Sequence, residues 1–262
     1  MTDEYAVIAA VYDLWSAPMA DDIPFYVAEA VRSGGPVLEV GVGTGRVAAA
    51  VARAGIDVVG VDVSPAMLAR ARDRLERDGV GDRVELIEGD MRRLDLPAHR
   101  FPLAMMPYRV LAHALTVEDQ LATLRGVRDH LVPGGRLVFN LPVPRADELA
   151  AMSDGLRREG RFPLDGGGEA ILWRQADYEP ASQLLHFRFV VEEVSADGVG
   201  GRRVHGDSTV RQCSPGEIEH ALARAELDLV ERWGWFDRRP FEAHSGEMVI
   251  VAAREDSWRR AS

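Results

Sequence analysis

Apolar residues recur along the first half of the chain in short unbroken runs that alternate with stretches of helical spacing. The short runs predict buried strands, and the stretches with an apolar residue every three or four positions predict helices. The predicted strands cover residues 36–40, 57–61, 83–87, 101–106 and 136–141. The predicted helices cover 45–54, a segment opening at Ser64-Pro65, and a segment that opens at Thr116 and ends before Pro133. This alternation predicts an α/β fold with a doubly wound parallel sheet.

The segments on either side of this core follow different patterns. Residues 4–15 and 21–32 have helical spacing and predict two leading helices. After residue 142 a helix is expected near 145–157, followed by period-2 patterns that predict antiparallel strands at 171–178, 184–194 and 203–211. A helix from Ser214 to Ala225 and strands at 227–233 and 247–252 close the chain. We expect one domain over 1–262, made of leading helices (1–35), a core (36–142), an antiparallel insert (143–213) and closing elements (214–262).

A glycine turn follows the first predicted strand, in the run from Val37 to Arg46. Gly41 and Gly43 let the chain turn sharply and let a ligand approach the backbone, which a Cβ would block. Asp62 ends the next predicted strand, where a carboxylate can accept hydrogen bonds from both hydroxyl groups of a ribose. Glycine turns also close strand-helix units for packing reasons alone. The glycine turn and Asp62 together favour a nucleoside-binding site.

A second acid follows the third predicted strand, in Gly89-Asp90-Met91. The carboxyl ends of parallel strands meet at one edge of a sheet, so Asp90 is expected beside the glycine turn. Its carboxylate can accept a hydrogen bond from the exocyclic amine of an adenine, while Met91 packs on the ring. Alternatively, Asp90 caps a turn.

The spacing of the glycines discriminates between cofactors. A dinucleotide-binding loop has its third glycine where this chain has Arg46, whereas here the third glycine falls one residue earlier, at Gly45. This disfavours an NAD-dependent oxidoreductase. The run Glu39-x-Gly-x-Gly-x-Gly resembles motif I of the class I S-adenosylmethionine (SAM)-dependent methyltransferases, and residues 36–142 are similar to their Rossmann-like core.

The resemblance implies a seven-stranded doubly wound sheet whose last strand is antiparallel, with a small antiparallel insert and leading helices that form a lid. It also implies that the glycine loop approaches the methionine part of SAM, while Asp62 binds its ribose and Asp90 its adenine. Tyr12 is the candidate for closing over the methionine end and Trp15 for lining the acceptor side; both can instead be core aromatics. The implied cofactor-binding residues are Glu39, Gly41, Gly43, Thr44, Gly45, Asp62, Val63, Asp90, Met91 and Tyr12.

A narrower resemblance rests on residues 106–113, 115–121 and 133–137, which are similar to bacterial small-molecule methyltransferases. The amino-sugar N-methyltransferases of antibiotic pathways share this layout, including an insert after the fifth strand. The resemblance implies methyl transfer in secondary metabolism to a small-molecule acceptor, with nitrogen or oxygen favoured over carbon. The insert then forms the acceptor site or the contact of a homodimer.

Three side chains near the predicted acceptor site are candidate catalytic residues: Tyr108, Arg109 and His113, all in the loop after the fourth strand. Methyl transfer is an in-line displacement, which needs alignment and, for an acceptor that carries a proton, a base. His113 is a candidate base or a structural histidine. Arg109 is a candidate clamp for an anionic acceptor group or one partner of a structural ion pair.

Composition narrows the range of partners. The net charge of -11 and the pI near 5.2 oppose binding to nucleic acid. There is no lysine and only one cysteine, and no His, Cys and carboxylate spacing indicates a metal centre. The acidic start and the lack of an apolar run of about 20 residues favour a soluble cytoplasmic protein without a membrane partner.

One alternative from another functional class stays open at this point. A protein can bind SAM or S-adenosylhomocysteine (SAH) without turnover, as a sensor or an interaction subunit. In the insert, His186 and Arg188 share a strand face that points to an acceptor pocket, a partner subunit or solvent.

Overall fold

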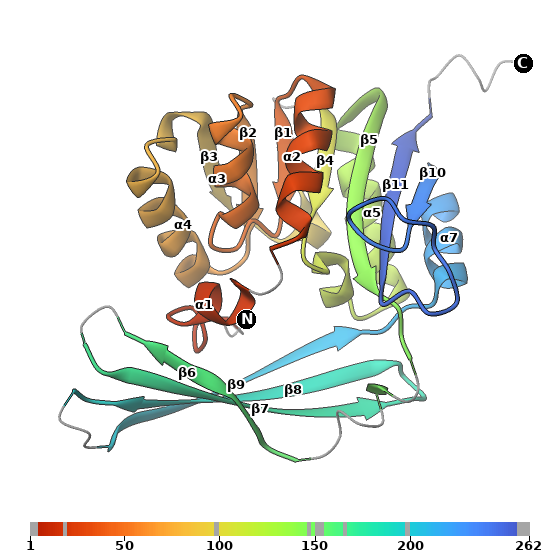
Figure 1. Ribbon diagram of the computed structural model, residues 1–262. Coiled ribbons are helices and arrows are strands. Elements are labelled where there is room, and N and C mark those ends of the chain that lie inside the picture. Colours follow the sequence, from red (N-terminus) through yellow and green to blue (C-terminus); the bar gives the residue numbers. More distant parts are fainter. Residues whose placement is uncertain are drawn as a thin grey trace, which may run out of the picture.

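The computed structural model describes residues 5–17, 20–96, 100–145, 148–149, 155–164, 167–196 and 200–255. These residues form two separate sheets, with seven strands in the larger and four in the smaller (Figure 1). The strands of the larger sheet are, in spatial order, β10 (Leu227–Trp233), β11 (Glu247–Arg254), β5 (Leu131–Pro142), β4 (Phe101–Met106), β1 (Val37–Val40), β2 (Val58–Asp62) and β3 (Val84–Glu88). Strands β1 to β5 are parallel, and β11 is antiparallel to both of its neighbours. The predicted Rossmann-like sheet with an antiparallel last strand is confirmed.

Helices cover both faces of the seven-stranded sheet. Helices α2 (Asp22–Ser33), α3 (Arg46–Arg53) and α4 (Pro65–Arg77) share one hydrophobic cluster, while α5 (Val117–His130) and α7 (Pro215–Arg224) pack in the other. Several of these helices begin at the capping residues that the sequence predicts. The Ser64 hydroxyl accepts a hydrogen bond from the Met67 amide at 3.2 Å, and Ser214 forms a complete capping box with Glu217. Local sequence therefore fixes where these helices start.

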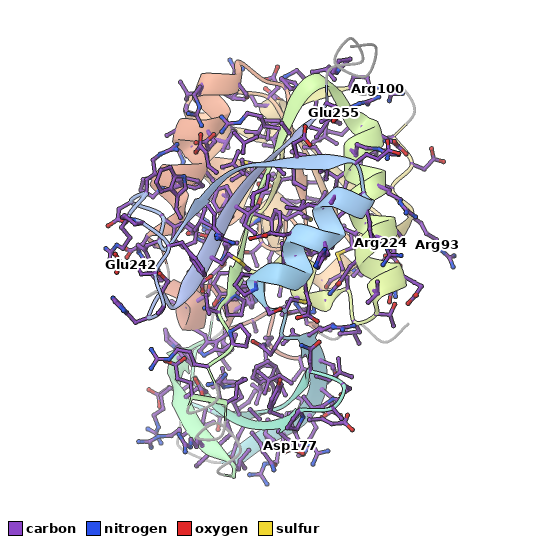
Figure 2. All side chains as sticks on the ribbon, turned by 90° about the vertical axis from the view of Figure 1, so that its right-hand side faces the viewer. Arg93, Arg100, Asp177, Arg224, Glu242 and Glu255 are labelled. Atoms are coloured by element: carbon purple, nitrogen blue, oxygen red, sulfur yellow. The ribbon has the colours of Figure 1, made fainter. Side chains whose placement is uncertain are left out.

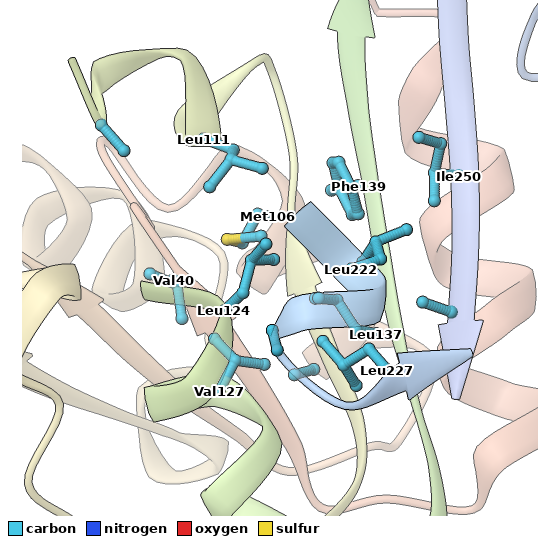
Figure 3. Close-up of a cluster of buried hydrophobic side chains, with 14 of the residues drawn as sticks. Val40, Met106, Leu111, Leu124, Val127, Leu137, Phe139, Leu222, Leu227 and Ile250 are labelled. Atoms are coloured by element: carbon cyan, nitrogen blue, oxygen red, sulfur yellow. The ribbon is translucent and has the colours of Figure 1, made fainter. Parts of the chain in front are cut away.

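One of the two hydrophobic clusters lies against the face that α5 and α7 cover. Phe139 of β5 and Met106 of β4 have no exposed surface there, and Leu124 and Leu222 project onto them from the two helices (Figure 3). The central strands β1 and β4 are buried on both faces, as is typical of parallel sheets. A rigid platform therefore supports the carboxyl ends of β1 to β4.

The smaller sheet is antiparallel throughout and has the order β6 (Arg157–Pro163), β7 (Glu169–Glu179), β8 (Leu184–Val194), β9 (Gly200–Arg211). Figure 1 shows it beyond the carboxyl ends of the parallel strands, and in Figure 2 Asp177 of β7 lies at the end of the molecule opposite Arg100 and Glu255. The predicted antiparallel insert is confirmed, with one more strand than the sequence pattern indicated.

The chain's leading segment, residues 5–16, fills the space between the two sheets (Figure 1). The predicted helix over 4–15 is wrong for most of its length. Residues 5–11 form turns that mix hydrogen bonds to the third and fourth preceding residue, and only α1 (Tyr12–Ser16) is helical. The reason is packing, because Ile8 and Val11 are fully buried in a cluster with Leu172 and Phe189 of the smaller sheet.

The predicted helix near 145–157 lies largely outside the described residues. Residues 148–149 are helical, but Arg157 already begins β6, a strand that the sequence pattern did not predict. Among the described residues, no helix combines the length and the apolar character needed to cross a membrane.

Candidate active site

A cavity of about 630 Å³ lies at the carboxyl ends of β1 to β4, and residues 5 and 12 of the leading segment line it from the other side. In this sheet order the chain leaves β1 and β4 in opposite directions, which opens a crevice where ligands of doubly wound sheets bind. The cavity is lined by the loops after all four strands and reaches Thr209 of β9.

The glycine loop after β1 forms one wall of this cavity. Gly43 has a φ of 54°, and a Cβ added there would meet nothing closer than the Gly41 carbonyl oxygen at 4.0 Å. Gly43 therefore leaves open space toward a ligand. Gly41 has a second reason to be glycine, since a Cβ there would lie 2.4 Å from a methyl group of Val110. Gly45 is required by packing rather than by the ligand, because its Cα faces Ala71 of α4.

Asp62 is held in a fixed orientation at the end of β2. One carboxylate oxygen accepts a hydrogen bond from the Gly43 amide at 2.8 Å, and the other accepts one from the Ser64 amide at 2.9 Å. A carboxylate held in this way at the cavity is of the type that accepts hydrogen bonds from hydroxyl groups. Val63 lines the cavity beside it and is 51% exposed. These residues fit the ribose of a nucleoside.

Asp90 both lines the cavity and caps a turn. Its side chain accepts hydrogen bonds from the backbone amide of Arg92 at 2.9 Å and from the Arg92 guanidinium at 2.6 Å. Hydrogen bonding from the Arg92 side chain holds the pKa of Asp90 below its ordinary value. Asp90 is therefore ionised at neutral pH, and Met91 lines the cavity beside it.

Glu39 lies under the glycine loop and does not line the cavity. Its side chain is 2% exposed, and its Oε2 atom has no hydrogen-bond partner in the structure. Burial raises the pKa of Glu39 to about 8. A buried carboxyl oxygen without a partner is costly, and the raised pKa keeps the Glu39 carboxyl group largely protonated at neutral pH.

Thr44 connects the glycine loop to the leading segment. Its hydroxyl donates a hydrogen bond to Asp13 of α1 at 2.5 Å, and Arg74 of α4 forms an ion pair with the same carboxylate at 2.6 Å. Thr44 does not line the cavity. Its contacts place it in the link between α1 and the loop.

Three tyrosines bring aromatic rings to the cavity, two from the leading segment and one from the loop after β4. Tyr12 contacts Tyr5 and Tyr108 edge to face, with ring centroids 5.8 and 6.2 Å apart. Burial raises the pKa of Tyr12 well above its ordinary value, so its hydroxyl keeps its proton. The guanidinium carbon of Arg46 lies 5.5 Å from the centre of the Tyr108 ring. Such a group of ring faces suits a cationic ligand.

His113 lies at the other end of the same wall. Its Nε2 atom forms a hydrogen bond of 2.9 Å with the Tyr5 hydroxyl. Burial lowers the pKa of His113 from its ordinary value of 6.5 to about 4. At neutral pH the ring is therefore uncharged and is a weak base.

Arg109 is absent from the cavity lining, unlike its neighbour Tyr108. Its guanidinium forms an ion pair with Glu247 of β11, with Nε 2.8 Å from the carboxylate. The prediction that Arg109 is a catalytic clamp is not supported, and the alternative of a structural ion pair describes its contacts. The partner lies too far away in sequence for any local pattern to indicate it.

Other predicted side chains lie away from the cavity. Trp15 packs on Phe189 and donates a hydrogen bond from Nε1 to Glu159 at 3.2 Å. His186 and Arg188 are on the exposed face of the smaller sheet, where they pair with Thr209 and Asp207.

The lining residues that sequence reasoning missed include Tyr5, Leu115, Asp119 and Thr209. Tyr5 had one weak signal, since it precedes Tyr12 by two helical turns on an apolar stripe. The others are unremarkable in the sequence. No group of three or more His, Cys, Asp or Glu side chains suited to a metal ion occurs in the part of the chain that the structure describes.

The fold is a doubly wound α/β fold, and the geometry of this site suits a nucleoside ligand. Comparison with known proteins specifies the class. Residues 37–135 match a family model described as a methyltransferase domain. The chain is 30% identical to the cypemycin N-terminal methyltransferase of a Streptomyces species over 97% of each protein. The chain therefore belongs to the class I SAM-dependent methyltransferases.

Solved structures agree with this assignment. The CcbJ methyltransferase of Streptomyces caelestis superposes with a TM-score of 0.79 at 29% identity, covering 97% of this chain and 98% of that one. The sugar N-methyltransferase KedS8 of a Streptoalloteichus species shares the fold, with a TM-score of 0.72 at 20% identity over 94% of this chain and 93% of that one. SAM is therefore the cofactor, and the oxidoreductase and non-catalytic alternatives are discarded.

Proposed function

We propose that this enzyme transfers the methyl group of SAM to a nitrogen atom of a small natural-product acceptor. We choose nitrogen because His113 is a weak base, with a pKa of about 4. Removing the proton of an alcohol needs a strong base, whereas an amine in its neutral form already presents a lone pair. The relative named for N-terminal methylation of cypemycin supports this choice.

The residues around the cavity suit each part of the cofactor. Asp62 would accept the ribose hydroxyls, and Asp90 with Met91 would hold the adenine. The open space beside Gly43 and the unpartnered oxygen of Glu39 suit the methionine end, over which Tyr12 would close. When bound, SAM supplies an electrophilic methyl group on a positively charged sulfur.

The acceptor would occupy the part of the cavity lined by Tyr5, His113 and Thr209. The neutral imidazole of His113 can accept or donate one hydrogen bond there, and the Tyr5 hydroxyl fixes the ring. Alignment of the nitrogen lone pair with the methyl group is then the main contribution to rate. The segment 5–16 acts as the lid, residues 36–142 as the cofactor core, and the smaller sheet as the acceptor side.

The test uses SAM with a deuterated methyl group and two pairs of probes. One pair is a short peptide with a free α-amine and its N-acetylated form; the other is an amino sugar and the matching sugar with a hydroxyl in place of the amine. We expect a mass gain only on the probes with an amine, and fragmentation that places the methyl group on nitrogen. Methyl transfer to a hydroxyl group would overturn the choice of nitrogen.

A further inference from the structure

The loop after β4 is held in an unusual backbone conformation at the cavity wall. Tyr108 and Arg109 are adjacent, and both have left-handed backbones, with φ of 57° and 67°. Side chains other than glycine adopt this conformation at a cost, so surrounding contacts must maintain it. The loop that carries Tyr108 therefore depends on an anchor.

The anchor is a chain of buried polar groups behind the cavity. Arg109 binds Glu247, which is 1% exposed. The other oxygen of Glu247 accepts a hydrogen bond from Asn140 of β5 at 3.1 Å, and Asn140 in turn accepts one from the Tyr26 hydroxyl of α2 at 3.0 Å. Asn140 and Tyr26 are also buried. Three elements, β11, β5 and α2, thus hold one guanidinium group.

The anchored loop touches the cofactor side of the cavity at two points. Tyr108 lies between the guanidinium of Arg46 and the ring of Tyr12. Val110 occupies the space beside the Cα of Gly41. Release of Arg109 would let Tyr108 leave this place, because the left-handed backbone would lose the contact that holds it.

We infer that Arg109 and Glu247 are positioning residues, which act on cofactor binding through Tyr108 without touching the cofactor. The inference rests on the placement of the methionine end of SAM beside Tyr12 under the proposed function. It assigns a role to the buried network of β5, β11 and α2, which lies outside the cavity lining.

A double-mutant cycle tests this with SAH as the probe and calorimetry as the measurement. We expect Arg109→Gly, Tyr108→Ala and the double variant each to weaken SAH binding about tenfold, because the two changes remove the same contact. Glycine suits the left-handed backbone, so the single change does not strain the loop. A merely structural role would give losses that add to about a hundredfold in the double variant.

The chain offers a matched control in Arg238. It also has a left-handed backbone, with φ of 63°, and also binds a glutamate that is 1% exposed, Glu29. It does not line the cavity. We expect Arg238→Gly to change SAH affinity less than about twofold. An equal loss in Arg238→Gly, or additive losses in the cycle, would overturn the inference.

A second variant guards against unfolding. Arg109→Gly leaves the carboxylate of Glu247 buried without its cation, so Arg109→Gly combined with Glu247→Gln removes that charge. We expect this pair to bind SAH as weakly as Arg109→Gly. Recovery of affinity to the wild-type level would show that the charge, rather than the position of Tyr108, was responsible. A different result would show that the methionine end of SAM does not lie beside Tyr12. In that case Tyr108→Ala by itself would bind SAH with full affinity.

Discussion

The two sheets of this enzyme are stabilised in different ways. The seven-stranded sheet is buried on both faces under helices, and it fixes the loops that bind the cofactor. The four-stranded sheet buries one face, mainly under residues 5–16, while its other face carries exposed ion pairs such as Arg188–Asp207. Exposed pairs of this kind contribute at most about 1 kcal/mol each. The difference suggests that cofactor binding is built on a rigid part and the acceptor side on a weaker one.

The largest expected effect is a loss of stability, and it should differ between the core of the larger sheet and the core of the smaller one. Phe139→Ala removes a fully buried ring from the larger sheet and should lower the free energy of unfolding by about 4 kcal/mol. Phe189→Ala in the smaller sheet should cost less, about 3 kcal/mol, and should change SAH affinity less than about threefold. Denaturant unfolding and calorimetry measure both. If Phe189→Ala abolishes SAH binding, the two parts are not separable.

The next largest expected effect is a loss of affinity for the cofactor. Asp62→Ala removes the carboxylate that binds two backbone amides and faces the cavity, and it should weaken SAH binding about a hundredfold or more. The control is Asp207→Ala on the exposed face of the smaller sheet, which should leave the affinity unchanged. Full binding by the Asp62 variant would place the cofactor elsewhere.

Two buried groups of the larger part, Glu39 and His113, respond to pH in opposite directions. The pKa of Glu39 is raised, so its contribution to stability is complete below pH 4.5 and is lost as the pH rises toward 8. The pKa of His113 is lowered, so its contribution is present above pH 6.5 and is lost as the pH falls toward 4.

Each pH-dependent loss of stability should disappear when the group that causes it is replaced. Glu39→Gln should flatten the loss between pH 4.5 and 8, and His113→Gln the loss between pH 6.5 and 4. The free energy of unfolding measured at pH 4.5, 6.5 and 8.5 checks both. A His113→Gln profile as steep as the wild type on the acid side would contradict the lowered pKa.

The smallest expected effect lies at the contact between lid and core. Tyr5→Phe removes the hydroxyl that binds His113 and should cost about 1 kcal/mol of stability. The same change should slow methyl transfer a few fold while SAH affinity stays constant, because Tyr5 lines the acceptor end. A weakened SAH affinity with an unchanged rate would move Tyr5 to the cofactor side.

Sequence patterns predicted the regular parts of this fold well. The bounds of β8 and β10 match the predicted 184–194 and 227–233. In β8 the alternating pattern marks a strand that packs Leu185 and Phe189 on a core. The caps at Ser64 and Ser214 are local interactions and were also predictable. β6 was not, since its charged and glycine-containing sequence at Arg157–Pro163 becomes a strand only by pairing with β7.

The site was predictable only where its chemistry is local. Gly43, Asp62 and Asp90 follow strand ends, and parallel topology brings those ends together. Tyr5 and His113 meet across 108 residues, and Arg109 meets Glu247 across 138. No period or motif encodes such contacts, because they arise from the packing of a segment that lacks regular structure of its own.

The position of the lid in the chain has a consequence for biosynthesis. Residues 5–16 leave the ribosome before the sheet on which they pack, because Trp15 contacts Phe189, roughly 170 residues later. At about 5–20 residues per second, the segment waits on the order of 10 to 30 s for that sheet. The segment is therefore synthesised well before its packing surface, and a nascent chain exposes the apolar face of Ile8 and Val11 throughout that interval.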